Sequence, residues 1–199
     1  MVSAPVSNGV YLRDTVRTAV KLLIVGHFAV GKTTFVGTLS EIRPLRTEET
    51  MTQAGAPVDD LAGVPGKGTT TVAMDFGRLT LNEQLVLYLF GAPGQQRFTQ
   101  LWKDIAHGSL GALVLADTRR LEHSFEVIGL LEEIGLHYAV AINHFDDAPV
   151  FPQEELREAL DLLPETPLVV CDARDRISST EALISLVDYL IRRTNQEHV

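Results

Sequence analysis

The chain has 199 residues, of which 45% are hydrophobic and 22% charged, proportions that exclude a disordered or collagen-like protein. A net charge of −9 at pH 7, without any basic run, argues against a general nucleic-acid binder. The single cysteine, Cys171, excludes an internal disulfide framework and a cysteine-rich zinc site.

Targeting signals are not evident in the sequence. No basic start precedes an apolar stretch, no lipidation box is present, and the apolar runs fall short of the roughly 20 residues that span a bilayer. We therefore expect a cytoplasmic protein, which only a partner would bring to a membrane. Residues 1–15 are expected to form a flexible segment ahead of one folded domain, residues 16–199.

Apolar runs and amphipathic stretches alternate along the chain. Residues 19–26 predict a buried strand and residues 32–42 a helix, whereas residues 44–70 lack a sustained period and predict a long loop. Two antiparallel strands are expected at 71–79 and 84–90. Further downstream, the pattern predicts strands at 111–117, 138–143 and 167–171, and helices at 98–107, 124–134, 154–163 and 180–193.

This alternation is typical of an α/β fold. It predicts a mostly parallel, six-stranded sheet with one antiparallel edge strand and helices on both faces. Ligands of such sheets bind at the carboxyl ends of the strands. The segments that follow the predicted strands are therefore the candidate sites.

The segment after the first strand carries the strongest motif. It is Gly26-His27-Phe28-Ala29-Val30-Gly31-Lys32-Thr33, which matches G-x-x-x-x-G-K-[ST]. Its glycines let the backbone wrap around a phosphate, toward which N–H groups and a helix N-terminus then point. Lys32 is expected to reach the β- and γ-phosphates and the Thr33 hydroxyl to coordinate Mg²⁺. A chance glycine-rich turn is the alternative, and the flanking strand and helix argue against it.

A second candidate is Asn143-His144-Phe145-Asp146, at the end of the strand predicted at 138–143. Asp146 is able to accept two hydrogen bonds from guanine, whose ring N–H lies beside an amino group, and adenine lacks this pair of donors. Asn143 is suited to tie this segment to the phosphate loop. An ordinary polar loop after a strand is the alternative.

Two weaker candidates follow other strands. In Cys171-Asp172-Ala173-Arg174, backbone N–H groups would approach a base carbonyl, and Cys171 is expected to be a small buried residue rather than a reactive thiol. In the segment 91–97, a glycine would offer its N–H to a terminal phosphate and the next glutamine would orient an attacking water. Plain connecting loops are the alternative for both.

These four segments, in this order and spacing, resemble the G-boxes of Ras-like small GTPases over residues 19–194. The stretches TTTVAMDFG, LFGAPGQQRF and NHFDDAP are similar to bacterial GTPases related to the gliding and polarity protein MglA, especially those of actinobacterial conservon operons. The resemblance implies a P-loop G domain. It also implies two partners, a Roadblock-domain protein and a sensor-kinase-like protein.

Carried over position by position, the resemblance implies GTP or GDP as ligand and Mg²⁺ as cofactor. It places the catalytic glutamine at Gln95, with Gln96 as the alternative. It places the metal ligands at Thr33 and Thr71, with Thr70 and Thr69 as alternatives for Thr71. The implied nucleotide contacts are Gly26, Phe28, Ala29, Val30, Gly31, Lys32, Thr33, Thr34, Gly94, Asn143, His144, Asp146, Cys171, Asp172, Ala173 and Arg174.

The chain departs from the family pattern in four places. Gly91 stands where most small GTPases have an Asp that binds Mg²⁺ through water, and His144 stands where Lys is usual. Phe28 replaces a glycine and would obstruct an arginine from an activating partner. The long loop at 44–70 leaves Arg43 and Arg46 as candidates for a catalytic arginine in the chain itself, although charge favoured at a helix C-terminus is the simpler explanation.

The leading hypothesis is a guanine-nucleotide switch that hydrolyses GTP slowly and signals through the loops 44–72 and 91–107. An interaction module that holds nucleotide with negligible hydrolysis is the second hypothesis. A P-loop small-molecule kinase is the third, but no lid with clustered arginines is visible.

Overall fold

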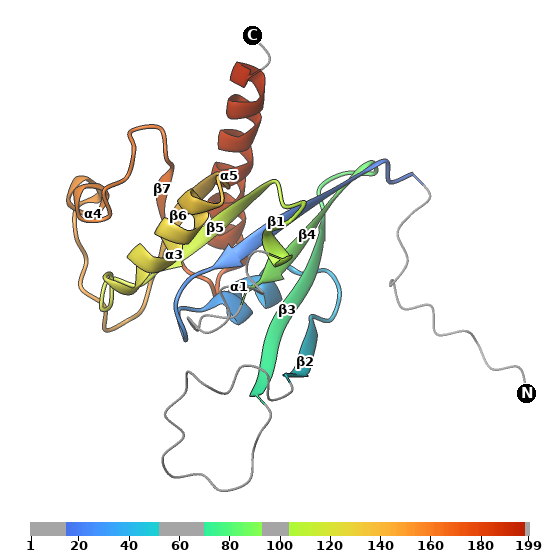
Figure 1. Cartoon of the computed structure of the whole chain (residues 1–199), viewed down its shortest axis with the longest axis horizontal. Coiled ribbons are helices and arrows are strands. Elements are labelled where there is room, and N and C mark those ends of the chain that lie inside the picture. Colours follow the sequence, from blue (N-terminus) through green and yellow to red (C-terminus); the bar gives the residue numbers. More distant parts are fainter. Residues whose placement is uncertain (1–14, 52–69, 93–103, 198–199) are drawn as a thin grey trace, which may run out of the picture.

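The computed structural model describes residues 15–51, 70–92 and 104–197 (Figure 1). Within them, strands and helices alternate as the sequence pattern predicts, and most bounds differ from the predicted ones by a few residues. The elements are β1 (Thr18–Val25), α1 (Lys32–Leu39), β2 (Leu45–Met51), β3 (Thr70–Thr80), β4 (Leu85–Gly91), β5 (Gly111–Ala116), α3 (His123–Glu133), β6 (Tyr138–Asn143), α4 (Gln153–Ala159), β7 (Leu168–Cys171) and α5 (Arg176–Glu197).

The strands form one sheet in the order β2-β3-β4-β1-β5-β6-β7. Strands β4, β1, β5, β6 and β7 pair in parallel, whereas β3 runs antiparallel to both of its neighbours, β4 and β2. The predicted α/β architecture, mostly parallel with one antiparallel strand and helices on both faces, is therefore confirmed.

The edge of the sheet differs from the prediction. Residues 45–51, expected to be part of a loop, form β2, so the described sheet has seven strands and β2, not the antiparallel β3, lies at this edge. The sequence LRTEETM carries no run of apolar residues. An edge strand is held by backbone pairing along one side, which requires little of its side chains. Of the helix predicted at 98–107, only residues 104–107 fall among the described residues, and 104–106 of these are helical.

Each face of the sheet is covered by its own hydrophobic core. Successive residues of a strand point to opposite faces. Leu22 and Ile24 of β1 accordingly join the core that α1 and α5 cover, and Leu23 and Val25 join the core that α3 and α4 cover. All four side chains are fully buried. Burial on both sides explains why β1 ends in an unbroken apolar run.

The parallel strands bring their carboxyl ends to one edge of the sheet. The register places Ile24 of β1 beside Gly91 of β4, and Asn143 of β6 beside Cys171 of β7. The loops that follow β1, β6 and β7 therefore start at the same edge of the sheet. The segment after β4 starts there too, but beyond Ala92 it lies outside the described residues.

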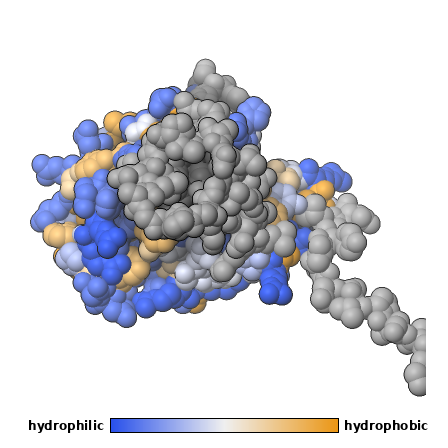
Figure 2. All heavy atoms as spheres, turned by 60° about the horizontal axis from the view of Figure 1, so that its bottom comes forward, coloured by the Kyte–Doolittle hydropathy of each residue, from blue (hydrophilic) through white to orange (hydrophobic). Residues whose placement is uncertain are grey.

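The surface of the described part carries both hydrophobic and hydrophilic residues. On the face that Figure 2 shows, hydrophobic residues lie in small groups among hydrophilic ones. Among the helices that the structure describes, none combines the length and apolarity that crossing a bilayer requires. Location in the cytoplasm stays a prediction. A flexible segment at 1–15 stays a prediction too, since residues 1–14 are not described.

Packing between β5 and α5 can be tested at Gly111. A Cβ there would lie 2.8 Å from both Cδ atoms of Leu190 and 3.0 Å from the carbonyl oxygen of His137. Gly111→Ala is expected to lower the free energy of unfolding by about 1–3 kcal/mol, because the added methyl overpacks this contact. Gly129→Ala is the matched control: Gly129 lies inside α3 with nothing within 4 Å of its would-be Cβ. It should raise stability by about 0.5–1 kcal/mol. Urea denaturation measures both, and equal stability of the two variants would contradict this packing.

Candidate functional site

The loop between β1 and α1 has the backbone geometry that a glycine-rich phosphate loop requires. Gly26, Ala29 and Gly31 have φ angles of 140°, 64° and 106°. A Cβ on Gly26 would clash with the carbonyl oxygen of Leu115, and one on Gly31 would lie 2.6 Å from Nδ2 of Asn143. These two positions therefore need glycine. Among the described residues, no side chain caps the N-terminus of α1 at Gly31, and the first N–H groups and the dipole of this helix favour an anion there.

Lys32 bends back over this loop. Its Nζ donates hydrogen bonds to the carbonyl oxygens of Gly26 and His27, at 2.8 and 2.7 Å. Burial lowers the pKa of Lys32 to about 8, and the nearby carboxylate of Asp75 opposes this shift. The ammonium is thus short of negative charge, which a phosphate would supply.

Thr33, the next residue, contacts a carboxylate that comes from another strand. Its Oγ1 donates a hydrogen bond to Oδ2 of Asp75 in β3, at 2.5 Å. Asp75 is paired in register with Gly91 at the end of β4. A Cβ on Gly91 would lie 3.0 Å from Cβ of Asp75 and 3.3 Å from its Oδ2. The Asp75 side chain therefore occupies the space that a side chain at 91 would need.

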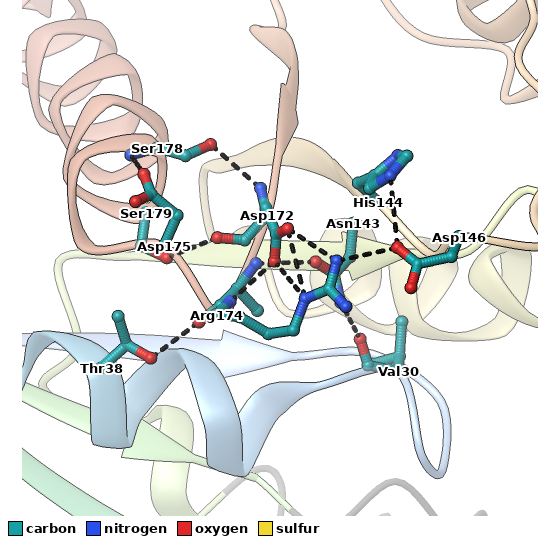
Figure 3. Close-up of polar contacts among 11 residues, drawn as sticks. Val30, Thr38, Asn143, His144, Asp146, Asp172, Arg174, Asp175, Ser178 and Ser179 are labelled. Carbon is teal, nitrogen blue, oxygen red and sulfur yellow. Dashed lines mark hydrogen bonds and ion pairs between the residues drawn. The ribbon is translucent and has the colours of Figure 1, made fainter.

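Asn143 connects three of the loops at this edge of the sheet. Its Nδ2 donates to the carbonyl oxygen of Val30 at 2.9 Å, and its Oδ1 accepts from the backbone N–H of Ala173 at 2.9 Å (Figure 3). The residue is only 4% exposed. This pair of contacts, called the Asn143 bridge below, includes the predicted tie to the phosphate loop and adds the loop after β7.

Asp146 and Asp172 share one arginine. Arg174 donates to Oδ1 of Asp146 at 3.2 Å and to Oδ2 of Asp172 at 2.8 Å, and Nε2 of His144 lies 3.8 Å from Oδ1 of Asp146 (Figure 3). The hydrogen bond from Arg174 lowers the pKa of Asp146, and the same guanidinium lowers that of Asp172 to about 2. Asp146 is thus an ionised, largely exposed acceptor at neutral pH.

A second arginine holds the 143–147 loop from the other side, and sequence reasoning missed it. Arg119 donates to Oδ2 of Asp117 and Oδ1 of Asp147, both at 2.7 Å, and its guanidinium lies 3.9 Å from the ring centroid of Phe145. Burial alone would raise the pKa of Asp117, but the hydrogen bonds from Arg119 outweigh burial and lower it. Asp117 directly follows β5, so the rule that singled out the other strand ends also points to it.

Other predicted residues contribute less or lie outside the description. Gly94 and Gln95 are outside the described residues. Thr71 lies in β3 opposite Thr50, but its side chain is not described. Cys171 is buried as expected, and burial raises the pKa of its thiol to about 12, so it offers the site only its backbone.

The tip of the phosphate loop is open to solvent. Phe28 is 68% exposed, and Ala29 beside it and Thr34 in the first turn of α1 are also exposed. Arg43 is exposed, whereas the side chain of Arg46 is not described. Among the described contacts, none joins Arg43 to the phosphate loop.

The fold is shared with solved G domains. The chain is similar to the G domain of the T. maritima FeoB iron transporter, with a TM-score of 0.58 and 19% identity over 86% of this chain and 99% of that one. It is also similar to the cytosolic domain of that transporter in a GDP form, with a TM-score of 0.62 and 18% identity over 87% of this chain and 64% of that longer one. These likenesses show a P-loop G-domain fold.

Sequence comparison places the chain in a family. Among curated proteins, none matches it. A model of the protein family described as conserved hypothetical ATP binding protein matches residues 24–193, a span that includes the phosphate loop, Asp75 and the Asn143 bridge. Because this match takes in most of the chain, the protein belongs to the family described as conserved hypothetical ATP binding proteins.

Proposed function

We propose that this chain is a guanine-nucleotide-binding switch that takes GTP and GDP with Mg²⁺ and hydrolyses GTP slowly. The Asn143 bridge is the observation that carries this proposal. One buried amide fixes the phosphate loop at Val30 and the loop after β7 at Ala173, and Asn143 itself begins the loop that bears Asp146. Phosphate-binding and base-binding groups are thereby held at a constant separation, as a nucleotide site requires.

Asp146 supports guanine as the base. Its carboxylate is kept ionised by the hydrogen bond from Arg174, so it accepts from the ring N–H and the amino group of guanine. Adenine presents an unprotonated ring nitrogen beside its amino group, which would face the carboxylate with like partial charge. The family description names ATP and one similar structure is a GDP form, so the base is the point on which experiment must decide.

The phosphate end supports the diphosphate and triphosphate as ligands. The N-terminus of α1 and the ammonium of Lys32 both lie along the loop 26–33. Mg²⁺, when bound with the nucleotide, would neutralise charge on the phosphates. In the proposed switch, Thr71 and Gly94 respond to the γ-phosphate and Gln95 orients the attacking water, roles that rest on the resemblance to Ras-like GTPases.

The proposal also includes partner proteins, which likewise rest on the resemblance to known GTPases. The relation to MglA and to the conservon GTPases rests on the three stretches quoted above, and with it come a Roadblock-domain protein and a sensor-kinase-like protein as partners. The exposed ring of Phe28 favours a second candidate function, an interaction module with negligible hydrolysis, because a bulky side chain at this position of the phosphate loop would obstruct an arginine supplied by a partner. GTP turnover with and without a Roadblock-domain partner separates the two.

Base recognition is tested by Asp146→Asn. The variant loses the ionised acceptor, and GDP is expected to bind about 100-fold more weakly, a change of about 3 kcal/mol. Xanthosine diphosphate should bind more tightly than to the unmodified chain, because the asparagine N–H donates to the carbonyl that replaces the amino group of guanine. Asp147→Asn is the matched control, since Asp147 lies on the same loop as Asp146 but contacts Arg119. Calorimetry with both nucleotides measures the exchange, and an unchanged preference in Asp146→Asn would refute guanine reading.

Phosphate binding is tested through Lys32. Its pKa of about 8 means that a substantial part of the free protein has a neutral Lys32 at pH 8.5. Phosphate oxygens raise that pKa, so GDP binding should take up a fraction of a proton at pH 8.5 and almost none at Lys32 at pH 7. Binding enthalpies in two buffers of different ionisation enthalpy report this uptake. Identical enthalpies in both buffers at pH 8.5 would show that Lys32 does not meet the phosphates.

A further inference from the structure

Thr33 is an expected ligand of Mg²⁺, and a magnesium site at Thr33 also requires a carboxylate from elsewhere in the chain. In P-loop NTPases the Mg²⁺ of the nucleotide is held by the Ser or Thr of the phosphate loop together with an Asp. Gly91, at the end of β4, has no side chain to offer. We propose that Asp75 of the neighbouring strand β3 supplies this carboxylate, so that Thr33 and Asp75 together position the cation. The inference rests on the proposed function.

The contact between the two residues has the geometry that this role requires. Thr33 donates its hydroxyl proton to Oδ2 of Asp75 at 2.5 Å. A hydroxyl that donates its proton keeps its oxygen lone pairs for a cation. The pair also lies next to the phosphate-binding lysine, since Lys32 directly precedes Thr33 in the chain. A carboxylate at this place thus contacts the expected metal ligand directly.

The chemistry of the pair fits Mg²⁺ and explains when it would bind. Mg²⁺ prefers oxygen ligands and is usually held by one or two carboxylates together with phosphates and water. In the part of the chain that the structure describes, no group of three or more His, Cys, Asp or Glu gathers around a metal position. Thr33 and Asp75 would hold the cation together with the phosphates of a nucleotide.

Gly91 is paired with Asp75 in the β3–β4 register. Because a Cβ at 91 would approach Cβ of Asp75 to 3.0 Å, aspartates at both positions would require one of the two side chains to shift. The glycine leaves room for the Asp75 side chain, which reaches across the β3–β4 pair toward Thr33. Where most small GTPases have a magnesium-binding Asp at the position of Gly91, this chain then carries the carboxylate on the neighbouring strand β3.

The first test is Asp75→Asn, read out by GDP affinity with Mg²⁺ and with EDTA. In the unmodified chain Mg²⁺ is expected to tighten GDP binding by about tenfold or more. The variant should keep the affinity measured in EDTA within about threefold and lose the gain from Mg²⁺. Asp188→Asn, on the exposed side of α5, is the control and should behave as the unmodified chain does.

The second test moves the carboxylate back to the other strand. The double variant Asp75→Gly/Gly91→Asp removes the Cβ that would clash and should regain the Mg²⁺ effect that Asp75→Asn lacks. Gly91→Asp alone should melt at a lower temperature, because its Cβ meets Asp75.

The outcomes separate the two proposals. If Asp75→Asn binds GDP and keeps the full Mg²⁺ effect, the role of Asp75 is refuted while the nucleotide switch stands. If Asp75→Asn does not fold, the double variant decides, and a folded double variant that binds GDP without any Mg²⁺ effect overturns the role. If the unmodified chain binds no guanine nucleotide under either condition, both proposals fail.

Discussion

The arrangement of the site depends on one buried side chain, Asn143. Its amide uses both ends, donating to Val30 in the phosphate loop and accepting from Ala173 after β7. A buried amide that is satisfied on both sides rigidifies its surroundings, and one left unpaired costs about 1–3 kcal/mol for each lost partner. Gly31 is part of the same constraint, since a Cβ there would meet Nδ2 of Asn143. The sheet brings the strand ends together, and this amide sets how the loops beyond them are spaced.

Charge at the site is divided between two arginine-centred networks, one on each side of the 143–147 loop. Arg174 contacts Asp146 and Asp172, and Arg119 contacts Asp117 and Asp147. Arg174 lowers the pKa of Asp146 and of Asp172, and hydrogen bonds from Arg119 lower that of Asp117 against the effect of burial. The two networks differ in burial, because Asp117 is 2% exposed whereas Asp146 is largely exposed. The buried network holds the loop, and the exposed one leaves its carboxylate within reach of a base. A ligand that replaces the contact from Arg174 pays little for it, since exposed ion pairs are weak.

Local patterns carried most of the fold prediction, and pairing between distant segments accounts for the rest. The phosphate loop and the alternation of strands and helices are visible within short windows, which is why their bounds agree closely with the structure. β2 was not predictable in this way, because an edge strand is defined by its partner β3 rather than by its own apolar pattern. The sequence alone assigns Asp75 no role, since only the register of β3 with β4 brings it to Gly91 and to Thr33.

The identity of the base is tested most directly by titrating the unmodified chain with GDP and with ADP, side by side, in the presence of Mg²⁺. If the Asn143 bridge sets a guanine site with Asp146 as its reader, GDP should bind at least about 100-fold more tightly than ADP, a difference of about 3 kcal/mol. Equal or tighter binding of ADP would contradict a guanine site and would agree instead with the family's description as ATP-binding proteins.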